Sequence, residues 1–173
     1  MCSRSRSLAL AAIVALACPV STNGLVETGG QAVPVSGSGV DHLTTALVHS
    51  VEPTPIGEIV KSTQIVELTG DLKGRVLYHV TSVFDFVAGR LVNTGDQVYS
   101  GTILGSAPVM IHDDQFRFEV DLITGEETGK VFLFHHIAGP KVRCELQLTE
   151  SSLTPEGNPA FGYKGLCWFR GNE

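Results

Sequence analysis

Residues 115–122 read QFRFEVDL, and this stretch decides the fold class. Every second residue is apolar, namely Phe116, Phe118, Val120 and Leu122. A period of two places successive side chains on opposite faces of an extended chain. The stretch therefore predicts a β-strand with one face in a core and the other in solvent.

Comparable strands are expected on both sides of this one. Residues 75–86 (RVLYHVTSVFDF) are apolar on both faces and predict a central strand covered on both sides. Runs rich in β-branched and aromatic residues predict further strands at residues 57–69, 90–93, 97–104, 109–112, 130–137, 142–149 and 161–169. Turn-forming residues separate them at positions 69–71, 94–96, 112–114, 124–126 and 138–140.

No segment carries an apolar stripe of helical period longer than about two turns, so the crossover helices of a parallel sheet are missing. The sequence predicts an all-β fold, a single antiparallel up-and-down β-barrel of about eight strands. Closure removes the exposed edges that a chain this rich in strands would otherwise present. A strongly curved β-sandwich is the alternative.

The composition fits one such domain and excludes one class of partner. The chain has 173 residues, of which 43% are hydrophobic, enough to bury a core. Its formal net charge is -6, with 12 basic residues against 18 acidic ones. Because a surface that binds nucleic acid needs clustered Lys and Arg, we expect no nucleic-acid partner.

Residues 1–24 have the pattern of a secretory signal peptide. Two arginines precede an apolar run at residues 8–20, which is shorter than the about 20 residues of a membrane-spanning helix. We therefore expect no transmembrane segment and a secreted protein, extracellular or periplasmic. Cleavage after Ala17 and cleavage near Gly24 both remain open, and lipid anchoring through Cys18 is a further alternative.

Residues 25–56 are rich in Gly, Ser, Thr and Pro and show no sustained period. This composition predicts a flexible arm between the signal peptide and the barrel. The barrel domain is then expected at residues 57–173.

Cys144 and Cys167 are the only cysteines of the expected domain. If residues 142–149 and 161–169 form a hairpin joined by residues 150–160, facing positions have numbers that sum to 311, as 144 and 167 do. The two thiols then meet on one face at a separation that suits a disulfide, which the compartment beyond a signal peptide favours. Two merely small and buried thiols are the alternative.

No sharp catalytic or metal motif is present. The chain has no G-x-S-x-G, no H-E-x-x-H, no phosphate-binding glycine loop and no C-x-x-C. His135 and His136 are adjacent, so in a strand they point to opposite faces, and no metal site is predicted. The tripeptide His112-Asp113-Asp114 is typical of a turn, with a metal or substrate ligand as the alternative. The catalytic residues stay unknown, and no cofactor is expected.

The barrel interior is the remaining candidate site. A hollow interior would take a small hydrophobic ligand, and buried tyrosine hydroxyls would need polar partners there. The ligand-binding candidates are Tyr78, Tyr99, Phe118, His135 and Tyr163. Plain core packing is the alternative for these side chains, because small barrels fill their interior.

The segments NTGDQVYSGT at residues 93–102 and GKV at residues 129–131 resemble the barrel superfamily of the allene oxide cyclases and plant dirigent proteins. The likeness covers residues 57–169 and is greatest to microbial proteins described as allene-oxide-cyclase-barrel-like. It implies a barrel with an apolar cavity that, in relatives, steers the cyclisation or coupling of a hydrophobic intermediate by shape, mostly without a cofactor.

The chain departs from that pattern in one respect. Both families carry a glycine-rich segment before the final strands, and PEGNPAF at residues 155–161 stands in its place here. No family catalytic residue is therefore carried over. A lipocalin-like barrel is the rival, but its early Gly-x-Trp signature is missing, because the only tryptophan is Trp168.

Two functions follow as alternatives. In the first, a secreted barrel binds a small hydrophobic molecule in its cavity, with or without acting on it as a cofactor-independent cyclase or isomerase. In the second, a non-catalytic secreted protein with a filled core binds a partner through its outer surface. The oligomeric state is left unknown by the sequence.

Overall fold

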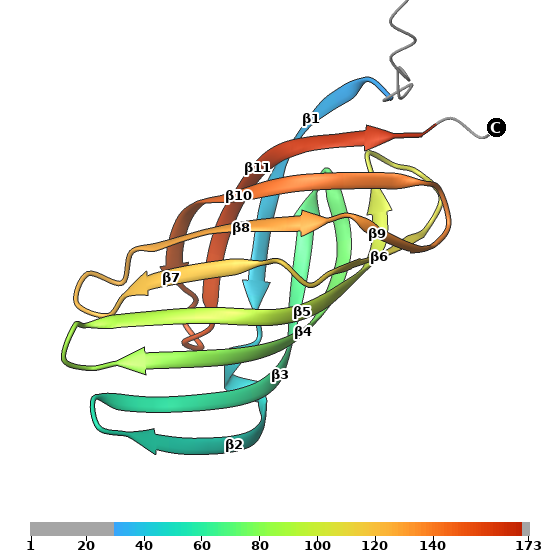
Figure 1. Cartoon of the computed structure of the whole chain (residues 1–173). Coiled ribbons are helices and arrows are strands. Elements are labelled where there is room, and N and C mark those ends of the chain that lie inside the picture. The colour runs from blue at the N-terminus through green and yellow to red at the C-terminus, as the bar shows by residue number, and fades with distance from the viewer. Residues whose placement is uncertain (1–29, 171–173) are drawn as a thin grey trace, which may run out of the picture.

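The computed structural model describes residues 30–170 (Figure 1). Strands follow one another along this part of the chain, with one short 3-10 turn. The elements are β1 (Ala32–Asp41), η1 (Leu43–Thr45), β2 (Leu47–Thr54), β3 (Gly57–Gly70), β4 (Leu72–Asp85), β5 (Arg90–Ile103), β6 (Val109–Asp113), β7 (Arg117–Asp121), β8 (Glu127–Leu133), β9 (His135–Ala138), β10 (Val142–Leu153) and β11 (Pro159–Phe169).

Eight of these strands close into an antiparallel barrel. β1 pairs with β3 on one side and with β11 on the other. The ring continues from β3 through β4, β5, β7, β8 and β10 back to β11. β2 extends the sheet beside β3, and β6 with β9 extends it beside β5. The predicted antiparallel barrel is confirmed.

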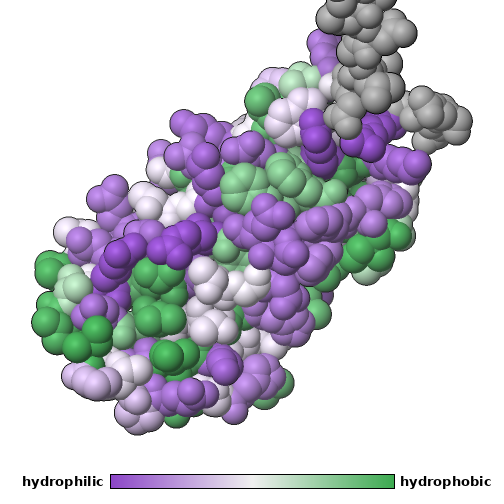
Figure 2. All heavy atoms as spheres, in the orientation of Figure 1, coloured by the Kyte–Doolittle hydropathy of each residue, from purple (hydrophilic) through white to green (hydrophobic). Residues whose placement is uncertain are grey.

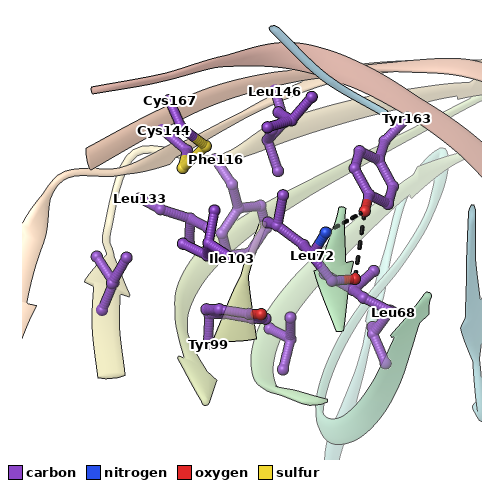
Figure 3. Close-up of a cluster of buried hydrophobic side chains, with 14 of the residues drawn as sticks. Leu68, Leu72, Tyr99, Ile103, Phe116, Leu133, Cys144, Leu146, Tyr163 and Cys167 are labelled. Carbon is purple, nitrogen blue, oxygen red and sulfur yellow. Dashed lines mark hydrogen bonds between the residues drawn. A yellow bond between two sulfur atoms is a disulfide. The ribbon is translucent and has the colours of Figure 1, made fainter. Parts of the chain in front are cut away.

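The two ends of the barrel differ. One end carries the β2–β3, β4–β5, β7–β8 and β10–β11 connections, and we call it the open end (Figure 1). The opposite, closed end is packed with fully buried side chains (Figure 3), among them Leu72, Ile103, Val109, Ile111 and Leu133. The apolar core thus fills one half of the interior.

Two tyrosine hydroxyls bond to the backbone at the closed end. The hydroxyl of Tyr99 donates to the carbonyl oxygen of Thr102 at 2.7 Å. The hydroxyl of Tyr163 accepts from the Leu72 N–H at 2.8 Å and lies 3.2 Å from the Leu72 carbonyl oxygen (Figure 3). It also lies 3.0 Å from the carbonyl oxygen of Thr69, to which it donates. The Tyr163 hydroxyl therefore holds the turn between β3 and β4, and the Tyr99 hydroxyl bonds near the end of β5.

The predicted disulfide is confirmed. Cys144 on β10 and Cys167 on β11 are directly paired in the register and are joined by a disulfide (Figure 3). The pairing keeps the predicted sum of residue numbers from Val142 to Leu148 and shifts only beyond that, where β10 bulges. The bond links two neighbouring strands of the barrel wall.

The expectation of a flexible arm over residues 25–56 is wrong for residues 32–54. Residues 32–41 form β1, which closes the barrel, and β2 follows it. The glycines of β1 serve close packing: a Cβ on Gly37 would lie 2.4 Å from the Tyr163 hydroxyl, and one on Gly39 would lie 2.4 Å from the ring of Phe161. The barrel accordingly begins at β1, ahead of the expected boundary at residue 57.

Three smaller expectations meet different outcomes. Residues 94–96 form no turn, because Gly95 continues β5 opposite Val80. The strand expected at residues 130–137 is divided into β8 and β9. The turn expected at residues 112–114 comes later, because His112 and Asp113 end β6 and the chain bends at Asp114; the Oδ1 of Asp113 accepts from the Gln115 N–H at 2.7 Å.

The expected signal peptide at residues 1–24 lies outside the described residues, as does Cys18. Among residues 30–170 there is no helix with the length and apolar character that crossing a membrane requires.

Candidate functional site

The interior of the barrel is hollow toward the open end. A cavity of about 530 Å³ lies there, bounded by the inner faces of the strands and by the η1, β7–β8 and β10–β11 segments. Its walls are mainly apolar and include Val66, Val76, Phe118, Leu133, Leu146 and Phe161. Cavities that hold small molecules have volumes of about 300–1,000 Å³, so this one has the size of a ligand site.

A row of polar side chains interrupts the apolar wall. Gln64 on β3 pairs with Tyr78 on β4, Tyr78 pairs with Gln97 on β5, and Gln97 pairs with Asp113 on β6. All four are buried, and the first three line the cavity. The amide of Gln97 donates to Oδ2 of Asp113 at 2.9 Å, and the Phe132 N–H donates to the same oxygen at 2.9 Å. The row gives the cavity one polar side.

Two carboxyl groups face the cavity from strand ends. Asp41 is the last residue of β1 and Glu127 is the first residue of β8. Burial, and then the charge of Glu127, raises the pKa of Asp41 from 3.8 to about 7. Burial likewise raises the pKa of Glu127. Asp41 is therefore about half protonated near neutral pH.

The Gln64 side chain adjusts to both forms of Asp41. One atom of its amide group lies 2.6 and 3.0 Å from the two carboxyl oxygens of Asp41, and the other lies 2.9 Å from the hydroxyl of Ser62. With the amide nitrogen toward Asp41, Gln64 donates to the ionised carboxylate; with the oxygen toward Asp41, it accepts from the protonated acid. A flip of the Gln64 amide group can thus accompany the protonation or ionisation of Asp41.

Two further polar groups of the cavity wall lack partners. Burial, and then the charges of Asp41 and Glu127, raises the pKa of the Tyr78 phenol, which stays neutral. Its hydroxyl makes no hydrogen bond to the residues that the structure describes. Oδ1 of Asn93 is buried and has no hydrogen-bond partner among those residues. Both atoms are free for a ligand.

The five sequence candidates fall into two groups. Tyr78, Phe118 and Tyr163 line the cavity. Tyr99 is buried at the closed end and does not line it. His135 lies on β9 outside the barrel, exposed, with its Nδ1 3.7 Å from a carboxyl oxygen of Asp114. The structure thus brings three of the five together and leaves two elsewhere.

The sequence interpretation missed the acidic groups of the cavity. Asp41 fell in the expected arm, and Glu127 followed an expected turn, where a carboxylate is ordinarily solvated. Gln64 and Asn93 belong to strands but carry no motif. The one usable signal for Gln64 is its period-two spacing from Val66 and Leu68, which places its side chain on the same inward face of β3 as these two apolar residues.

The ionisable side chains that line the cavity determine which reactions it could catalyse. A carboxyl group with a pKa near the working pH can give or take a proton, which general acid–base catalysis requires. The residues lining the cavity include no Lys, Arg, His or Cys. Within the described part of the chain, no three His, Cys, Asp or Glu side chains gather as a metal site would require.

The cavity therefore combines apolar walls, a polar row and two carboxyl groups of raised pKa. Comparison of the chain with protein-family models, with curated proteins and with solved structures finds no match.

Proposed function

We propose that the protein binds a small hydrophobic molecule in the barrel cavity. The observation that carries this proposal is the cavity itself, about 530 Å³ in volume with mainly apolar walls. A ligand there would remove its own apolar surface and that of the walls from water, a gain of about 25 cal/mol per Å². The polar row would fix its orientation, as the few polar groups of ligand cavities ordinarily do.

The surface around the open end supports entry of an apolar molecule. Figure 2 shows hydrophobic side chains gathered at the end of the molecule that carries the β4–β5 and β7–β8 connections. Phe86, Val87 and Ile123 are 61%, 81% and 85% exposed there. The two connections touch, because the Leu122 N–H donates to the carbonyl oxygen of Gly89 at 2.8 Å. A hydrophobic molecule would meet this surface first.

Catalysis on the bound molecule is the second part of the proposal. Asp41 would act as proton donor and acceptor in a cofactor-independent isomerisation or cyclisation, since its pKa of about 7 provides both forms at neutral pH.

The disulfide between Cys144 and Cys167 supports a secreted protein, because such bonds persist in oxidising compartments. The alternative, a protein with a filled core that acts through its outer surface, has less support, because the interior holds this cavity.

A fluorescence titration tests binding. Prodan, a neutral dye whose emission shifts to the blue in apolar surroundings, should bind the full chain. Leu148→Trp, which adds bulk to the cavity wall, should weaken binding by about tenfold or more. Leu166→Trp, on the outer face of β11, is the matched control and should leave binding unchanged. No blue shift with the wild-type protein, or equal binding by both variants, would contradict the proposal.

A further inference from the structure

The carboxyl groups of the cavity lack what carboxylates on the outer surface have. On the outside, Glu119 forms ion pairs with both Arg90 and Arg117. Asp41 and Glu127 have no basic partner in the described part of the chain, and no base lines the cavity they face. A half-buried carboxylate without a counter-charge is unfavourable until a cation or a proton neutralises it.

The other unpaired groups of the cavity wall also accept hydrogen bonds. Oδ1 of Asn93 is buried without a donor among residues 30–170. The side chain of Tyr78 is only 5% exposed, and its hydroxyl oxygen is unpaired within the same residues. An amide oxygen is purely an acceptor, and a phenol oxygen accepts as well as donates. Unpaired acceptors in the cavity therefore outnumber unpaired donors, since only the Tyr78 hydroxyl has a proton to give, and an ammonium group supplies three donors.

Aromatic rings add a second attraction for positive charge. Phe118 lies beside Tyr78 with ring centroids 6.2 Å apart and the rings tilted, and Phe84 and Phe161 also line the cavity. The face of an aromatic ring attracts a cation within about 6 Å, most strongly away from water. Rings and carboxyl groups in one cavity suit a molecule that is apolar and positively charged.

The entrance to the cavity is negatively charged, as the two carboxylates inside it are. The connections at residues 86–89, 122–126 and 154–158 contain Glu126 and Glu156 and no Lys or Arg. The whole chain has a formal net charge of -6. A negative entrance raises the local concentration of cations and lowers that of anions.

We propose that the cavity takes an apolar molecule that carries a protonated amine, with the ammonium group held by Asp41 and Glu127 and the apolar body against Phe118 and the aliphatic wall. The inference rests on the proposed function and names the chemical class of its ligand. The competing arrangement, in which protonated carboxyl groups donate to a neutral ligand, is an outcome of the test.

Two probes that differ in one group separate these cases. 2-(1-Naphthyl)ethylamine, whose pKa is about 10, is a cation at about pH 8, and 2-(1-naphthyl)ethanol is its neutral counterpart. Calorimetric titration of the full chain should show the amine binding about tenfold or more tightly than the alcohol. This ratio is measured on the wild-type protein, so it does not depend on the folding of any variant.

Variants then locate the cation. The double variant Asp41→Asn with Glu127→Gln should bring the two dissociation constants together, while Glu67→Gln, an exposed residue of β3 outside both the cavity and its entrance, should preserve the ratio. Equal or weaker binding of the amine, with the alcohol bound, would overturn the inference and leave the proposed function standing. Failure of both probes to bind would contradict both. An amine preference that survives the double variant would also overturn the inference.

Discussion

Gln64 and Asp41 form a hydrogen-bonded pair that is satisfied whether or not Asp41 is ionised. The amide reaches the carboxyl group with one end and the Ser62 hydroxyl with the other, and either end can donate or accept as needed. Because Asp41 keeps hydrogen bonds in both its ionised and its protonated form, the cavity wall can accommodate this carboxyl group. This hydrogen bonding does not remove the unfavourable effect of burial on the charged form, and stability should therefore depend on pH.

The first prediction concerns that dependence. The pKa of Asp41 is raised from 3.8 to about 7, so between these values the folded protein binds the proton more tightly than the unfolded chain does. The contribution of Asp41 to the free energy of unfolding is fully present below its ordinary pKa of 3.8 and is lost as the pH rises through 7. Asp41→Asn, which is neutral at every pH, should raise the free energy of unfolding at about pH 8 by up to about 4 kcal/mol.

Urea unfolding of the variant at two pH values measures this effect. The advantage of Asp41→Asn over the wild type should vanish below about pH 3, where Asp41 is protonated in both the folded and the unfolded state. Glu126→Gln, an exposed residue at the same end of the barrel, should show no such pH-dependent gain. Equal stability of the wild type and Asp41→Asn at about pH 8 would show that the Asp41 carboxyl ionises there without penalty.

The second prediction compares two buried tyrosines. The hydroxyl of Tyr163 satisfies the buried N–H of Leu72 and donates to the backbone at Thr69, whereas the hydroxyl of Tyr78 has no partner in the described chain. Tyr163→Phe leaves the Leu72 N–H unsatisfied and should lower the free energy of unfolding by about 1–3 kcal/mol. Tyr78→Phe removes a hydroxyl without orphaning a partner and should change it by less than about 0.5 kcal/mol.

Both variants lose the same oxygen atom from the same kind of ring, so each controls for the other. Denaturant midpoints at equal slopes give the comparison directly. A loss for Tyr78→Phe as large as that for Tyr163→Phe would mean that the Tyr78 hydroxyl has a structural partner, and it would weaken the assignment of that group to a ligand.

The strands of the barrel were predictable from the sequence where one face is buried. Residues 115–122 alternate apolar and polar residues, and residues 117–121 of this stretch form β7 with Phe118 buried and Arg117 exposed. The register of the last hairpin, and with it the disulfide, followed from the symmetry of the expected turn. Local pattern and tertiary structure agree at these places.

β1 shows why the rest could not be predicted. Its segment, AVPVSGSGVD, has the composition of a linker, yet its glycines leave room for the rings of Tyr163 and Phe161. Those partners are more than 100 residues away along the chain, so no local signal records the need for a small residue. Asp41 was missed for the same reason, because its burial depends on barrel closure by strands distant in sequence.

Asp113 was predicted for one role and has a second. Its place in a turn was visible in the sequence, and one carboxyl oxygen does serve that turn. The other oxygen accepts from Gln97 on a neighbouring strand and from the Phe132 N–H, which only the assembled barrel brings near. The candidate site was therefore predictable as an aromatic interior but not as an acidic cavity.

The last prediction concerns the disulfide between β10 and β11. Cys144 and Cys167 are separated by 23 residues, and closing a loop of that length restricts the unfolded chain by about 3 kcal/mol. Reduction of the wild-type protein should therefore lower its free energy of unfolding by roughly that amount, measured in urea with and without dithiothreitol. The double variant C144A/C167A should be destabilised to a similar or greater extent, because it also loses buried side-chain volume, and it should not respond to the reductant. Identical urea midpoints for the oxidised and reduced wild type would show that the bond is not what holds the last hairpin, and that its paired register and the packing of the closed end suffice.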